Sequence, residues 1–163
     1  MLSWNERPVE VANLFNPAFC SILLHEAVNS YQVEKANGLP YVLAFLLLPT
    51  VLHQTTRDSL PRTIRTRMHV WLQNNPEILI GFATRAKQFA PITRESIIFS
   101  MKSKTIAIDN DGYLVPTTRR FRSPSWEANS EPATCYRKSQ FLGRWFAQSG
   151  ETSTILTMWG IRP

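Results

Sequence analysis

Apolar residues recur at helical spacing along most of the chain, and prolines or asparagines mark where the periodic stretches begin. At Asn16 and Pro17 an N-cap residue precedes a proline suited to the first helical turn. Apolar side chains at three- and four-residue spacing then predict an amphipathic helix that ends at Asn37 and Gly38. The residues before Asn16 predict only a short helix or arm.

A nearly continuous apolar run predicts the next helix, from Tyr41 to about His53, at the centre of the domain. Pro49 is expected to kink or break this helix, because proline lacks the N–H of a helical hydrogen bond and clashes with the preceding turn. Pro61 is expected to begin a third helix, whose apolar face contains Met68 and Trp71.

The pattern between Asn75 and Val115 is typical of a winged helix-turn-helix unit. It predicts a fourth helix that starts at Asn75 and Pro76 and stops at Pro91, and a fifth helix capped by Thr93. Two β-rich segments follow, and Asp109 to Gly112 between them is a strong turn sequence. Winged helices bind DNA, but they also serve as protein docking modules.

Residues 116–131 have the proline, serine and arginine content of an exposed loop. After this loop, Pro132 is expected to begin a sixth helix that reaches about Gln148, and residues 151–159 predict two or three further turns. The sequence therefore predicts a mainly α fold: one domain, residues 1–163, of about six to seven helices, with a winged-helix-like unit at 75–115, a basic loop and C-terminal helices at 132–160.

The whole excess of positive over negative charge lies in the second half of the protein. The 163 residues carry a net charge of +6, but residues 1–81 hold six Lys/Arg and six Asp/Glu, whereas residues 82–163 hold twelve and six. Such an excess attracts phosphate backbones or acidic protein surfaces. The candidate DNA or phosphate contacts are Arg94, Lys102, Lys104, Arg119, Arg120 and Arg122.

Those cations leave two interpretations nearly even. Arginines interleaved with Phe121 suit contacts to phosphates and insertion into a groove. The same loop equally suits solvation of the domain or docking of an acidic partner. The predicted fifth helix displays few residues of the kind that recognise bases.

Trp126, in the polar loop, and Trp159, near the C-terminus, are the candidate protein-interface residues, because exposed tryptophans often anchor interfaces. The other three tryptophans are expected in the core. Cys20 and Cys135 are far apart and lack neighbouring ligands, so both are expected to be buried free thiols.

The sequence contains no recognisable catalytic or metal-binding motif. The three histidines are scattered, no glycine-rich phosphate loop is present, and a turn explains Asp109 to Gly112 better than a calcium loop does. We therefore expect no catalytic residues, no metal and no cofactor. The longest apolar run is too short to span a membrane, and the N-terminus lacks the features of a signal peptide, which favours a cytoplasmic protein.

Several stretches resemble the middle components of bacterial three-component ABC systems, small proteins encoded with a Rad50/SMC-like ATPase and a variable effector, as in Lamassu-type defence. In chain order, these stretches are NERPVEVANLFNPAFCSILL, PYVLAFLLLPTVLH followed by TTRDSLPR, WLQNNPE, FAPITRESIIF, DNDG and TMWGIRP.

This resemblance implies a non-enzymatic subunit that bridges the ATPase to a nuclease or toxin effector and helps to hold the effector inactive until foreign DNA is sensed. The expected partners are thus an SMC/Rad50-like ATPase and an effector, with double-stranded DNA contacted through the complex and no membrane. The alternative is a free-standing winged-helix DNA-binding regulator. A nuclease without a recognisable motif is a distant third possibility, because it requires clustered acidic residues.

Overall fold

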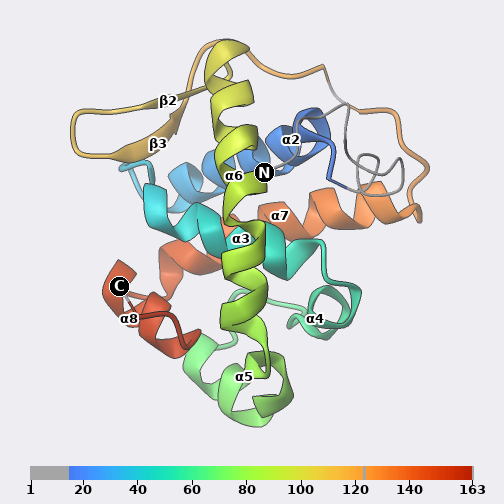
Figure 1. Ribbon diagram of the computed structural model, residues 1–163, viewed down its shortest axis with the longest axis vertical. Coiled ribbons are helices and arrows are strands. Elements are labelled where there is room, and N and C mark those ends of the chain that lie inside the picture. The colour runs from blue at the N-terminus through green and yellow to red at the C-terminus, as the bar shows by residue number, and fades with distance from the viewer. Residues whose placement is uncertain (1–14, 123, 163) are drawn as a thin grey trace.

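The computed structural model describes residues 15–122 and 124–162, which are mainly helical (Figure 1). These residues contain seven α-helices, α2 to α8, and one small antiparallel sheet. The predicted fold class, a mainly α domain with six to seven helices and a β-hairpin, is confirmed. The short helix or arm predicted before Asn16, and Trp4 within it, lie outside the described residues.

Helices α2 (Pro17–Glu34) and α7 (Glu131–Gln148) pack along one another and provide much of the core. The helix α2 begins where the sequence predicts, since the Asn16 Oδ1 accepts a hydrogen bond from the Ala18 N–H at 2.9 Å. The two backbones come so close that a Cβ on Gly143 would lie 2.2 Å from the Ala27 carbonyl oxygen. This packing therefore requires a residue without a side chain.

The apolar run forms a 3-10 turn, η2 (Tyr41–Leu43), followed by α3 (Ala44–Val51), in which every residue except Phe45 is buried. The predicted central helix is confirmed, although it ends at Val51, two residues after Pro49. A short helix that the sequence did not predict, α4 (Gln54–Ser59), comes next.

The helix predicted to start at Pro61 begins only at Met68, as α5 (Met68–Asn74). The preceding segment has no helix, and two tryptophans bind its ends instead. The Trp71 indole N–H donates to the Ser59 carbonyl at 3.1 Å, and the Trp145 indole N–H donates to the Thr66 carbonyl at 2.7 Å. Buried indoles need such acceptors, and these bonds hold the chain in an irregular path.

The predicted helix-turn-helix is wrong. Residues 76–79 form only a 3-10 turn, η3 (Pro76–Leu79), and one helix, α6 (Phe82–Lys102), then continues through Pro91. Thr93 is not an N-cap, because its hydroxyl donates back to the Phe89 carbonyl at 3.1 Å. Ser96 and Ser100 make the same bond to the carbonyls four residues earlier, so these buried hydroxyls are satisfied inside one helix.

The predicted hairpin is confirmed as β2 (Ile106–Ile108) and β3 (Tyr113–Pro116). The Asp109 carboxylate accepts hydrogen bonds from the N–H groups of Asp111 and Tyr113, which makes 109–112 a turn. A third strand, β1 (Leu39–Pro40), pairs with β3 and ties the end of α2 to the hairpin.

The last helix, α8 (Thr152–Met158), follows Gly150, and Figure 1 shows it close to α5. In the same view, α6 crosses in front of α3, so that one side of this long helix faces outward. One cluster of buried residues extends from Cys20 to Trp159 and includes residues of α2, α3, α6, α7 and α8.

Candidate interaction surfaces

The predicted basic cluster lies on the segment that leaves the hairpin. The Thr117 hydroxyl donates a hydrogen bond to the Lys104 carbonyl at the end of α6, and it accepts one from the Arg119 N–H at 3.2 Å. Thr117 thereby places Arg119 beside Lys104. Lys102 and Lys104 are both exposed, so the structure brings Lys102, Lys104 and Arg119 to one end of α6.

Arg120 and Arg122 lie over α2 instead. They line a polar groove of about 530 Å³ together with His25, Glu26 and Asn29. Phe121 is half-buried between the two arginines, and its ring meets the His25 ring edge to face at 5.3 Å. The aromatic side chain therefore anchors the loop to α2, while both arginine side chains remain exposed.

The polar groove contains one carboxylate whose ionised form is stabilised. Burial opposes ionisation of Glu26, but hydrogen bonds from His25, Gln140 and Tyr136 outweigh burial and lower its pKa below the ordinary 4.5. Burial and the neighbouring Glu26 raise the pKa of Tyr136 to about 12. At neutral pH the groove thus combines a negative carboxylate with the cations on its loop.

Arg94 is separate from the other predicted contacts. It lies midway along α6, and its guanidinium carbon is 5.7 Å from the centre of the Phe45 ring. There it lines a second hollow, the α6 groove, formed by η2, α3, α6, α8 and the residues after α8. The structure therefore divides the six predicted cations among three places rather than one DNA-binding face.

The two candidate interface tryptophans differ in exposure. Trp126 is half-buried and packs edge to face against Phe19 and Tyr136, both at 5.7 Å, so it joins the loop to α2 and α7. Trp159 is fully buried, and its indole lies 4.6 Å from the Phe82 ring. Trp159 is a core residue in this chain, so the prediction that it anchors an interface is wrong.

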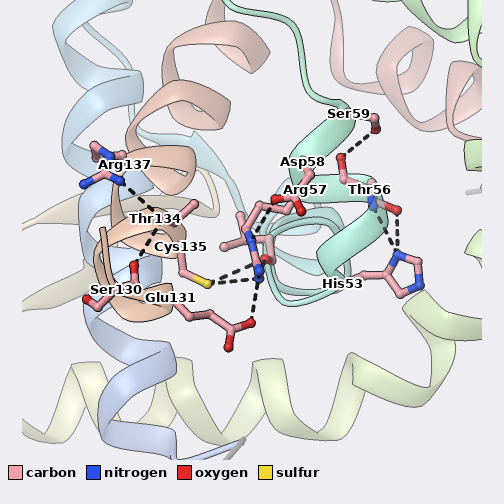
Figure 2. Close-up of polar contacts among 11 residues, drawn as sticks. His53, Thr56, Arg57, Asp58, Ser59, Ser130, Glu131, Thr134, Cys135 and Arg137 are labelled. Atoms are coloured by element: carbon pink, nitrogen blue, oxygen red, sulfur yellow. Dashed lines mark hydrogen bonds and ion pairs between the residues drawn. The ribbon is translucent and has the colours of Figure 1, made fainter. Parts of the chain in front are cut away.

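Figure 2 shows a buried polar centre that sequence reasoning missed. Arg57 of α4 is only 3% exposed. It donates hydrogen bonds to the Val51 carbonyl at 3.0 Å, to the Cys135 sulfur at 3.3 Å and to the Glu131 carboxylate at 3.0 Å. Because Glu131 and Cys135 belong to α7, this arginine joins the two halves of the chain.

The two cysteines and His53 have structural roles in this part of the chain. Both cysteines are free and buried, as predicted. Burial raises the pKa of Cys20 to about 12, and it also raises the pKa of Cys135 despite the adjacent Arg57. His53 caps α4 by accepting the Thr56 N–H, and burial with the charges of Arg85 and Arg57 lowers its pKa.

Apolar side chains on α6 are exposed where the sequence pattern predicts that Ile98 and Met101 face inward. Ile98 and Met101 are 51% and 42% exposed, and Ile80 just before the helix is 78% exposed.

Within residues 15–122 and 124–162, no group of three or more histidine, cysteine, aspartate or glutamate residues is placed to hold a metal ion. No helix in that part of the chain is long and apolar enough to cross a membrane.

Comparison with known proteins identifies a family for this chain. Neither the curated proteins nor the solved structures include a significant match. A family model does match: the ABC-three component (ABC-3C) system Middle Component 3, or MC3, aligns with residues 4–163. Because that alignment covers nearly the whole sequence, the chain belongs to the MC3 family of middle components of ABC-three component systems.

Proposed function

We propose that this middle component is a non-enzymatic adaptor that bridges an SMC/Rad50-like ATPase and an effector, a nuclease or toxin, in a bacterial DNA-sensing defence complex of the Lamassu type. The single observation that carries the proposal is the family match over residues 4–163, since a middle component belongs to a system with other subunits. The exposed apolar and basic side chains of α6 are consistent with contacts to such subunits.

An adaptor needs two separate contact regions, and two surfaces of the described residues support this part of the proposal. The α6 groove and the loop segment of Arg120 and Arg122 lie over different elements, the first over α3 and α8 and the second over α2. One region can thus contact the ATPase while the other contacts the effector or DNA held by the complex.

Co-purification tests the adaptor function. The chain carries an affinity tag and is expressed together with its neighbouring genes, and the eluate is resolved by size-exclusion chromatography and mass spectrometry. We expect ATPase, middle component and effector to elute together, and we expect the ATPase and effector to separate when the middle component is omitted. Elution of the tagged chain alone would show that it is no adaptor.

A second candidate, a DNA-binding regulator acting alone, is favoured only by the exposed arginine loop, because the helix-turn-helix is absent from α6. It predicts that the purified chain binds duplex DNA with an affinity that falls as salt rises. Replacing Arg119, Arg120 and Arg122 with Ala then reduces the logarithmic salt slope by about 2 to 3.

The matched control for this measurement replaces Arg62, Arg65 and Arg67 with Ala. These arginines are also exposed, but they lie between α4 and α5, outside the basic loop. An equal change in slope for both triple variants indicates nonspecific charge rather than a DNA site. No binding by the wild type at low salt removes the regulator hypothesis.

A further inference from the structure

The α6 groove has the shape and lining of a binding site for an apolar ridge. It is a hollow of about 520 Å³ between α6, η2, α3 and the residues after α8. Ala83, Ala86 and Ala90 line it from α6, and their small side chains leave room beside the larger Tyr41 and Phe45 rings. Val42 is 43% exposed at its edge. Apolar surface in a concavity of this kind favours a partner that removes it from water.

The charges around the groove have one sign. Lys87, Arg94 and Arg162 line it, all three are exposed, and no carboxylate lines it within the described part of the chain. None of the three cations forms an ion pair with a described aspartate or glutamate. A ligand that brings carboxylates to this rim therefore meets complementary charge.

The outer face of α6 extends the same surface. Ala83, Lys87, Ala90 and Arg94 recur at three- and four-residue spacing, and Ile98 and Met101 continue that stripe towards the hairpin. From Ala83 to Arg94 the helix advances by about 16 Å, the length of about three helical turns. A short helix laid along α6 thus matches the length of the groove.

We infer that the α6 groove binds an acidic amphipathic helix of a partner subunit. Its apolar side chains, spaced by three or four residues, would enter the hollow, and its aspartates or glutamates would face Lys87, Arg94 and Arg162. The apolar floor argues against DNA as the occupant, because a sugar-phosphate backbone gains from the cations but not from the Tyr41 and Phe45 rings. This inference rests on the adaptor function and adds the surface and the chemistry of the partner.

Photo-crosslinking locates the occupant in the intact complex. Ala83 is exposed, so Ala83→benzoylphenylalanine places a crosslinker in the groove with little effect on folding. Irradiation of the co-purified complex should join this position to an acidic helical segment of the ATPase or effector, identified by peptide mass spectrometry. The exposed Gln73 of α5 carries the crosslinker in the control. Crosslinks to DNA, or equal crosslinking from Gln73 to the same segment, would overturn the inference.

Charge reversal measures the contribution of the rim. The double variant Lys87→Glu and Arg94→Glu should weaken association with the crosslinked subunit by about tenfold or more, because like charges then meet across the interface. The control reverses two exposed arginines outside the groove, Arg62→Glu and Arg65→Glu, and should retain wild-type association. Thermal unfolding of both variants verifies that each chain is folded.

The outcomes separate this inference from the adaptor function. If the wild-type chain co-purifies with its partners and the groove variants do so equally well, the adaptor function stands and the groove assignment is wrong. If the wild-type chain does not co-purify, both are wrong. Two results together establish the groove as the docking site of one subunit. The folded Lys87→Glu and Arg94→Glu variant loses that subunit while the control variant retains it, and the crosslinker at position 83 joins the same subunit.

Discussion

The interface between α2 and α7 and the outer face of α6 show two different uses of a long helix. At the first, Gly143 lies against the Ala27 backbone with no space for a methyl group, so the sequence there is constrained by packing. At the second, small and apolar side chains such as Ala83 and Ile98 are exposed to solvent. The first region holds the fold together, whereas the second leaves apolar side chains exposed.

Among the substitutions that test this comparison, Gly143→Ala is expected to reduce the stability of the fold most. The new Cβ would lie 2.2 Å from the Ala27 carbonyl oxygen, so the two helices must move apart. We expect a loss of about 3 kcal/mol in the free energy of unfolding and a Tm lower by roughly 6 to 12 °C. Thermal unfolding followed by circular dichroism measures this change. Thr84→Ala on the outer face of α6 is the control, expected within about 0.5 kcal/mol of wild type.

A smaller effect is expected at the polar centre that joins α4 to α7. Arg57→Met removes the hydrogen bonds to the Val51 carbonyl, the Cys135 sulfur and Glu131, and should cost about 2 kcal/mol in the free energy of unfolding. The Glu131 side chain is 64% exposed, so Glu131→Gln should cost less than about 1 kcal/mol. Urea denaturation compares the two variants, and equal losses would contradict a role for the buried end of Arg57.

The smallest effect concerns pH. The folded chain lowers the pKa of Glu26 below 4.5, so the carboxylate's contribution to stability is fully present above pH 4.5 and is lost as the pH falls through the folded pKa. Glu26→Gln should therefore weaken the chain at neutral pH and reduce the further loss of stability in acid. Denaturation midpoints at about pH 7 and about pH 3.5 measure the difference. Glu77→Gln, at an exposed site on η3, is the control variant for this measurement.

Local signals predicted several elements correctly. The helix expected from Pro132 to Gln148 is α7, because Ser130 caps its first turn and proline is compatible with that turn. The Asp109 to Gly112 turn was also predictable, since its hydrogen bonds stay within five residues of sequence. In both places the structure depends on neighbours in the chain.

The errors arise where distant contacts outweigh local signals. Pro91 and Thr93 have the sequence of a helix stop and a new N-cap, yet α6 continues because its inner face is buried along its length and its hydroxyls bond to carbonyls four residues earlier. Arg57 gave no signal because Glu131 and Cys135 lie more than 70 residues away. Burial of Trp159 likewise depends on Phe82 and Met68.

The tryptophans give the protein a built-in optical reporter. Trp71 lies 5.4 Å from Trp145 and 6.1 Å from Trp159, measured between ring centres, so three indoles form one fixed cluster in the core. A near-ultraviolet circular dichroism signal from this cluster depends on rigid packing and disappears when the core loosens. Trp126 is half-buried on the loop, away from that cluster. Comparison of the wild type with a Trp126→Phe variant therefore separates the signal of the loop from that of the core without any added label.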